Sequence, residues 1–388
     1  MLIGVIAIKR FIGVLIIMVL CPLLSGCWNY QGLNKISIVS GVAVDRKVED
    51  NKYHLTIEMF DLAAAGKDGG IKSQIVEAEG KTIYEAVRNA NKRLSKKLYF
   101  ADMQLVVISN QIAREEGIQY LLDWFMRNEK PRETFSTVIS QEKTAKEILT
   151  ASGVDHKIVS EEIEKILDDD NKSTASSKNI DTYKALNILQ GEKQTALVLP
   201  AVHCTDNQEK KVVEVNGVAV FKADKLQGYL SPEETKYYLF AVDEAKGGIL
   251  TFPFHEKSQT KQDNLSFEIF KNKTKQSYSY DDNRLKIFFD VKTTASLGEV
   301  GTNVDVFKKD NIEEIRATAM SVFEQRLETV IKKVQTEFGC DVFGFGTMIS
   351  KKDPVLWSKL QENWGDYIQN AEVEVKSEFV IINTGLMK

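Results

Sequence analysis

Cysteine and histidine are scarce in this sequence, which has four of each in 388 residues. The cysteines form no CxxC pair and no even framework of spacings, and they are Cys21, Cys27, Cys204 and Cys340. This pattern excludes a disulfide-stapled scaffold and argues against a cysteine zinc site. The histidines are scattered without ligand spacing, and they are His54, His156, His203 and His255. His203 stands beside Cys204, but neighbours in a strand point to opposite faces, so we predict no metal site.

Catalytic motifs are missing as well. The sequence contains no GxSxG, no HExxH and no P-loop. Gly344-Phe345-Gly346 begins like a dinucleotide fingerprint, but Ile349 stands where the third glycine is required. The motif also follows a predicted helix rather than a strand. We therefore interpret it as a helix stop and turn, with a contact surface as the alternative. The sequence predicts no enzyme and no cofactor.

Net charge gives no sign of a polyanionic partner. Lys and Arg number 51 against 55 Asp and Glu, and this balance provides no bulk attraction to nucleic acid or to anionic lipid. We therefore predict no nucleic-acid partner. A local exception is a basic helix end, formed by Arg88, Lys92, Arg93, Lys96 and Lys97. We interpret it as a solvated face that complements the helix dipole, with contact to phospholipid headgroups as the alternative.

A long apolar run lies at the start of the chain. Lys9 and Arg10 precede it and small residues follow it, which is the layout of a secretory signal. Its uncharged core of about 14 residues is short for a membrane-spanning helix, which needs ~20. The run ends in Leu24-Ser25-Gly26-Cys27, which resembles the bacterial lipobox. We therefore predict that residues 1–26 are a signal peptide.

The residue types at the end of the leader fit the chemistry of lipidation. Small Ser25 and Gly26 let a signal peptidase approach the backbone closely. The Cys27 thiolate would take a diacylglyceryl group as a thioether and become the mature N-terminus, and two acyl chains anchor a protein stably where one does not. The alternative is an uncleaved transmembrane anchor with an incidental Cys27. Trp28 and Tyr30 follow Cys27 directly. We interpret them either as rings at the membrane interface or as part of a plain tether.

Strands and helices alternate in the first half of the remaining chain. Apolar or alternating segments predict strands at residues 36–44, 53–59, 103–108 and 134–140. Capping boxes at Thr82 and Thr144 open helices. This alternation predicts a mixed α/β N-terminal domain over residues 28–190. The stretch Asp168 to Lys178, DDDNKSTASSK, is predicted to be a linker or an exposed loop.

The rest of the chain is predicted to form two further domains. Residues 191–258 form a small middle domain, which contains a helix with Ser231 at its N-cap and Pro232 at its first position. Residues 259–388 form a C-terminal domain with antiparallel strands, a long helix over residues 312–338 and a closing strand. The antiparallel strands are predicted at residues 265–270, 277–280 and 285–291. The predicted fold class is α+β, with three mixed α/β domains after a lipoprotein signal peptide.

Two pairs of side chains have open interpretations. Trp357 and Trp364 flank a predicted short helix, and we interpret them as core residues, with a partner-binding aromatic patch as the alternative. Cys204 and Cys340 are interpreted as isolated thiols rather than as a disulfide.

Five blocks of the sequence occur in the order of a known family. They are the lipobox with Trp28 and residues 36–45; Arg127 to Arg132; Ala145 to Leu149; Gly217 to Lys222 with Gly228 to Leu230; and Asp341 to Gly346 with Trp357, Trp364, the final strand and Gly385. Together they resemble the C-subunit lipoproteins of spore germinant receptors, the Ger(x)C family. The resemblance covers most of the chain after the leader, and the last block is the most specific.

The resemblance implies a lipid-anchored, peripheral subunit on the outer face of the spore inner membrane. Membrane lipid on acylated Cys27 would hold it beside two integral membrane receptor subunits, A and B. The assembled receptor responds to small nutrients and triggers germination, and contact between this subunit and the nutrient stays open. The family has three mixed α/β domains and no established catalytic residues. The alternatives are a solute-binding lipoprotein of a nutrient transporter and a surface hydrolase.

Overall fold

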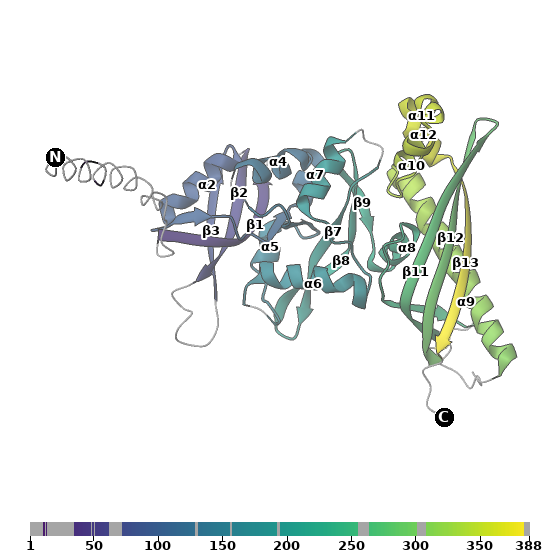
Figure 1. Ribbon diagram of the computed structural model, residues 1–388. Helices are drawn as coiled ribbons and strands as arrows, with labels where there is room; N and C mark the ends of the chain where they lie inside the picture. The colour runs from purple at the N-terminus through teal and green to yellow at the C-terminus, as the bar shows by residue number, and fades with distance from the viewer. Residues whose placement is uncertain are drawn as a thin grey trace, which may run out of the picture.

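The computed structural model describes residues 11, 13, 35–47, 49, 51–61, 72–128, 131–155, 157–191, 195–254, 264–300 and 308–383. In this part of the chain the strands form two sheets, which lie one after the other along an elongated molecule with helices packed against them (Figure 1). The predicted signal peptide and Cys27 lie outside the described residues.

The first sheet has the strand order β3-β2-β1-β5-β6-β7-β8-β9, and β4 pairs with the start of β1. Its strands are β1 (Ile36–Lys47), β2 (Lys52–Asp61), β3 (Lys72–Gly80), β4 (Lys97–Tyr99), β5 (Leu105–Ile108), β6 (Ser136–Ser140), β7 (Val198–Asn207), β8 (Lys210–Lys222) and β9 (Lys225–Leu230). The central strands β1, β5, β6 and β7 are parallel, and antiparallel strands flank them. Every residue of β5 is buried, as is typical of a parallel strand covered on both faces.

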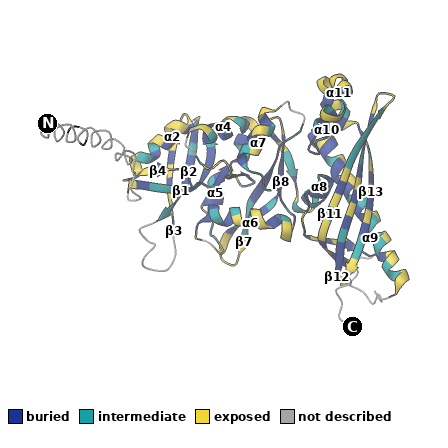
Figure 2. Cartoon of the chain, viewed as in Figure 1, coloured by how far each residue is buried: buried dark blue, intermediate teal, exposed yellow. Residues whose placement is uncertain are grey.

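Helices cover both faces of the first sheet (Figure 2). They are α2 (Ile83–Ala90), the 3₁₀ helix η3 (Asn91–Arg93), α3 (Asn110–Glu115), α4 (Gln119–Asn128), α5 (Ala145–Leu149), α6 (Val159–Ser173) and α7 (Thr182–Gln190). Val42 and Val44 on β1 share a buried cluster with residues of α2, α3, α4 and α7. Ala43, between them, belongs to a second cluster with residues of α5 and α6. The two clusters follow from the two-residue period of a strand.

The second sheet has the order β10-β11-β12-β13. Its strands are β10 (Ile249–Pro253), β11 (Asn264–Asp281), β12 (Arg284–Val300) and β13 (Glu372–Asn383). The accompanying helices are α8 (Pro232–Ala241), α9 (Lys309–Lys333), the π-helix η4 (Val334–Phe338), α10 (Phe345–Lys352), α11 (Pro354–Leu360), the 3₁₀ helix η5 (Gln361–Asn363) and α12 (Trp364–Gln369). α9 packs on β13, where the Phe323 and Phe379 ring centroids lie 5.4 Å apart.

The predicted fold class is confirmed, because the described chain is a mixture of helices and strands in two sheets. The antiparallel strands and the long helix of the last third are present, but predicted strands 265–270 and 277–280 belong to one strand, β11. The closing strand β13 pairs with β12 in parallel. The capping box predicted at Thr144 and the N-cap predicted at Ser231 are confirmed, and Ser231 also forms a capping box, in which a hydroxyl and a glutamate satisfy backbone N–H groups reciprocally. At Thr82 only the hydroxyl half is formed.

The predicted linker at residues 168–178 is wrong over its first half. α6 continues to Ser173, so the acidic run lies on a helix whose other side buries Leu167. Asp170 is only 5% exposed, and its carboxylate accepts a hydrogen bond from the Ser177 backbone N–H at 2.7 Å. The polar residues therefore close the end of a helix instead of forming a solvated spacer. The first sheet also continues through the predicted boundary at residue 190, and the division into three domains stays a prediction.

Candidate functional site

The predicted lipidation site lies outside the described residues. Cys27 and the lipobox residues Leu24, Ser25 and Gly26 fall there, as do Trp28, Tyr30, His156, His255 and Gly385. Within the described part of the chain, no helix combines the length and the apolar character needed to cross a membrane. The lipidation site therefore remains a prediction from the sequence.

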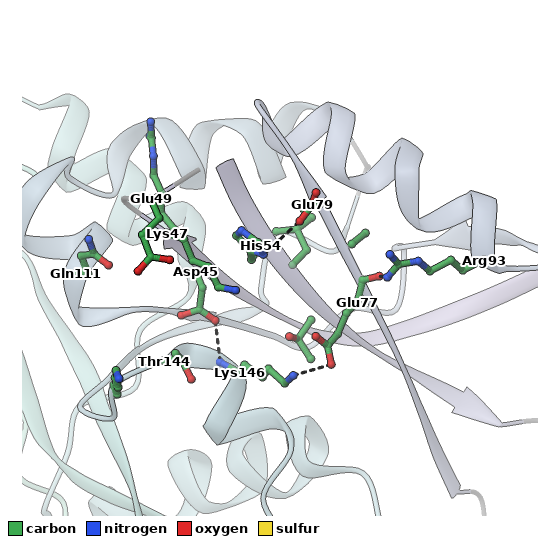
Figure 3. A pocket seen from close by; sticks show the side chains of 15 residues that line it. Asp45, Lys47, Glu49, His54, Glu77, Glu79, Arg93, Gln111, Thr144 and Lys146 are labelled. Atoms are coloured by element: carbon green, nitrogen blue, oxygen red, sulfur yellow. Dashed lines mark hydrogen bonds and ion pairs between the residues drawn. The ribbon is translucent and has the colours of Figure 1, made fainter. Parts of the chain in front are cut away.

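A polar pocket of about 660 Å³ opens at one edge of the first sheet (Figure 3). It lies where β1 ends, where β2 begins and where the last residues of β3 approach the start of α5. The register of β2 with β3 places His54 opposite Glu79 and Thr56 opposite Glu77. The sheet thus gathers charged side chains from segments that are far apart in the sequence.

Asp45, at the base of this pocket, is buried and holds the start of α5. Its two carboxylate oxygens accept hydrogen bonds from the backbone N–H groups of Ala145, at 2.7 Å, and Lys146, at 3.0 Å. Burial raises the pKa of Asp45, while these two backbone N–H groups lower it. Because the fold already uses both oxygens, this carboxylate serves as a helix cap and not as a free base.

Several charged groups at the rim of the pocket form ion pairs or hydrogen bonds. The Lys146 ammonium lies 2.7 Å from the Glu77 carboxylate, and Arg93 donates a hydrogen bond to the Glu77 carbonyl. His54 Nδ1 lies 3.9 Å from Glu79, whose carboxylate also pairs with Lys52 at 2.5 Å. The site therefore offers a charged surface of both signs to a polar partner. In the described residues no three His, Cys, Asp or Glu side chains gather in a way that could hold a metal ion.

Sequence reasoning missed this pocket because no local motif marks it. Asp45 stands at the end of a buried strand, and Thr144 opens a capping box, yet 100 residues separate Asp45 from Ala145. The signal that was available is a carboxylate directly after the apolar segment 36–44, which marks a strand end where helix N-termini collect.

The structure decides two of the open interpretations. Trp357 and Trp364 pack edge to face with ring centroids 5.3 Å apart, and both are at least nine-tenths buried, which confirms their core role. Cys204 and Cys340 are free thiols, as interpreted from the sequence. Burial raises the pKa of Cys204 to about 11 and that of Cys340 to about 12, so neither is a reactive thiolate at neutral pH.

The Gly-Phe-Gly motif is a turn, as predicted, but it opens a helix as well as following one. Gly344 has a φ of 83° and is the N-cap of α10. The buried Asp341 carboxylate accepts hydrogen bonds from the backbone N–H groups of Phe343, Gly344 and Gly346. Burial raises the pKa of Asp341 to about 6, against the lowering effect of these bonds. The motif therefore organises the backbone around a buried acid.

Comparison with known proteins agrees with this architecture. Residues 29–203 match the family model described as "Spore germination protein N-terminal domain", and residues 216–385 match "Spore germination B3/ GerAC like, C-terminal". The fold and these two matches define a spore germination protein. The chain belongs to the Ger(x)C family, whose members act in spore germination.

Curated relatives and a solved structure cover nearly the whole chain. Spore germination protein KC of Bacillus subtilis (strain 168) is 26% identical over 94% of this chain and 93% of its own length. Spore germination protein A3 of the same organism is 23% identical over 96% of this chain and 98% of its own. The crystal structure of the GerBC protein shares the fold, with a TM-score of 0.58 at 18% identity over 88% of this chain and 97% of that one.

Proposed function

We propose that this chain is the lipid-anchored, non-enzymatic subunit of a nutrient germinant receptor, assembled with two integral membrane subunits, A and B. The observation that carries the proposal is that germination-family models match both halves of the chain. The lipobox-like ending at Cys27 supplies the anchor, on the outer face of the spore inner membrane. The division into bodies over residues 28–190, 191–258 and 259–388 is part of the same proposal.

The position of the first described strand supports a short tether. Lys35 stands eight residues after Cys27 and directly precedes β1. Eight residues span at most about 29 Å when fully extended. A lipid on Cys27 would therefore hold the first sheet close to the bilayer surface, within reach of integral membrane subunits.

The work of such a subunit is binding. The polar pocket at Asp45 offers paired charges, and the oxygens of its buried acid are already occupied by the backbone of α5. The Thr144 hydroxyl in the pocket lining donates to the Glu147 carboxylate at 2.9 Å, as part of the capping box of α5. These features favour a contact surface for partner subunits over a reaction centre.

A deletion in a spore-forming host tests the proposal. Loss of this chain should slow germination in response to a defined subset of nutrients, while germination triggered without nutrients continues. Pull-down of the tagged chain from spore membranes in mild detergent should recover the two integral subunits. An unchanged response to every nutrient of a panel, together with recovery of the chain alone, would contradict the proposal.

The second candidate function is a solute-binding lipoprotein of a nutrient transporter. The pocket volume favours it, because ligand pockets occupy ~300–1,000 Å³. Against it, such a protein should have two doubly wound lobes, whereas the second sheet here contains the long β11–β12 hairpin. A nutrient that raises the melting temperature of the purified chain would favour this candidate.

A further inference from the structure

A cluster of positive charge stands out in a chain of negative net charge. Residues 81–101 contain six basic residues and one acidic residue, Glu85, while the whole chain carries −4. The structure places this segment at the end of the first sheet where β1 begins, on α2, η3 and β4 (Figure 2). Basic residues are thus concentrated at this end of the first sheet.

Packing turns these basic side chains outward. α2 buries Ile83 and Val87, and its other side exposes Arg88. On β4 the buried residue is Leu98, so Lys97 before it faces solvent. The Leu98 backbone N–H donates a hydrogen bond to the Asn91 side chain at 3.4 Å, which ties β4 to η3. We call the resulting surface the basic face, and it consists of Lys35, Arg88, Lys92, Lys96 and Lys97.

The lysines of the basic face are not used by the fold. Among the described residues, no carboxylate pairs with the ammonium groups of Lys92, Lys96 or Lys97, in contrast to Lys146 in the polar pocket. Isolated lysines of this kind attract an external anionic surface, because their charge is not cancelled locally.

Two exposed tyrosines border the basic face. The exposed fraction is 48% for Tyr84 and 43% for Tyr99. The Arg88 guanidinium lies 5.0 Å from the Tyr84 ring centroid and donates a hydrogen bond to its hydroxyl at 2.9 Å. Tyrosine rings beside lysine and arginine are typical of surfaces that contact the headgroup layer of a membrane.

The chain enters the body at the basic face. β1 pairs in parallel with β4, and this register sets Ile36 against Lys97 and Ile38 against Tyr99. Cys27 precedes Lys35 by eight residues, which reach at most about 29 Å. The basic face is therefore the end of the body that a lipid on Cys27 would hold nearest to the bilayer.

We infer that the basic face lies against the anionic phospholipid headgroups of the membrane and orients the body upon it. The closeness of the basic face to the bilayer rests on the proposed lipid anchor, whereas the attraction of its lysines to anionic lipid does not. Tethering confines the body near the surface, so a weak electrostatic contact is enough to select one orientation. The opposite end of the body, with α9 to α12, then points away from the bilayer (Figure 1).

Binding of the non-lipidated chain to vesicles measures the electrostatic contribution to membrane binding separately from the lipid anchor. The chain used is residues 27–388 with Cys27→Ala, which is the expected processed form without the acyl group. It should sediment with vesicles of mixed phosphatidylcholine and phosphatidylglycerol and not with phosphatidylcholine alone. Binding should be lost as salt rises from ~0.15 M to ~1 M, because the Debye length falls from ~8 Å to ~3 Å.

Charge reversal identifies the surface. Lys92→Glu, Lys96→Glu and Lys97→Glu together should weaken binding about 100-fold, since each basic residue near an anionic surface contributes a factor of about five. The matched control reverses three exposed lysines of α10 and α11, Lys351, Lys352 and Lys359, and should bind like the parent chain. Thermal unfolding of all three chains checks that they are folded.

Several outcomes would overturn the inference. They are equal binding of the two triple variants, equal binding to neutral and anionic vesicles, and binding of the parent chain to the purified integral subunits but not to vesicles. The last result would make the basic face a protein interface. An unmodified Cys27 in the native protein would instead remove the proposed anchor and leave the vesicle result standing, so the two proposals fail separately.

Discussion

Glu58 on β2 caps the start of α6 through Ser160, 102 residues further along the chain. Its carboxylate accepts hydrogen bonds from the Ser160 backbone N–H at 2.9 Å and from the Ser160 hydroxyl at 2.7 Å. A third bond comes from the Val159 backbone N–H at 2.9 Å. The residue before α6, Ile158, has no side chain that could cap it. With Asp45 at the start of α5, two buried carboxylates on neighbouring strands cap two neighbouring helices.

Replacing Glu58 by glutamine should destabilise the fold. The amide would set an N–H₂ group against backbone N–H donors, and the side chain is fully buried, so unsatisfied donors remain. We expect a loss of about 2–3 kcal/mol in the free energy of unfolding, measured in urea. Glu378→Gln, at a side chain with 58% of its area exposed, is the control and should change it by less than about 0.5 kcal/mol. Equal effects of the two substitutions would show that the cap is unimportant.

Glu164 on α6 should make stability fall as pH rises. Burial and the nearby Asp168 and Asp181 carboxylates raise the pKa of Glu164 to about 7. The folded chain therefore binds this proton more tightly than the unfolded chain, so stability is lost between its ordinary pKa and about 7. After allowance for solvent screening, Glu164→Gln should add about 1 kcal/mol to the free energy of unfolding at pH 8. It should add nothing in acid, below the ordinary pKa of glutamate. Urea unfolding at both pH values measures this, and a pH-independent difference would contradict it.

Gly217→Ala should destabilise the packing of β8 against the end of β9. Gly217 has a φ of 79°, and an added Cβ would lie 2.0 Å from the Leu230 carbonyl oxygen. Left-handed strain and this clash should together cost at least about 2 kcal/mol. Gly298→Ala is the matched control, because its Cβ would meet nothing closer than 3.7 Å. Comparable melting temperatures for the two variants would refute the steric argument.

Local signals in the sequence predicted local structure well. The capping boxes at Thr144 and Ser231 involve residues three positions apart, so the sequence alone identifies both partners. β3 is absent from the predicted strands because Val76 and Ala78 are its only buried apolar residues, too few to give a distinct pattern. Composition alone predicts a linker at the acidic end of α6, because composition does not show that Asp170 is buried.

The candidate site could not be predicted, because its contacts are long-range. Lys146 meets Glu77, and Asp45 meets Ala145, only after β1, β2 and β3 have paired. The basic residues were visible in the sequence. Their position beside the start of β1 was not visible in the sequence, because it depends on the pairing of β4 with β1.

The lipid proposed on Cys27 is tested most directly by the mass of the N-terminal peptide of the native protein. The chain should be purified from spore inner membranes, digested and analysed by mass spectrometry. We predict a peptide that begins at Cys27 and carries a diacylglyceryl thioether, with or without a further acyl group on its amine. A peptide with a free thiol at Cys27, or one that retains residues of the leader, would contradict the account.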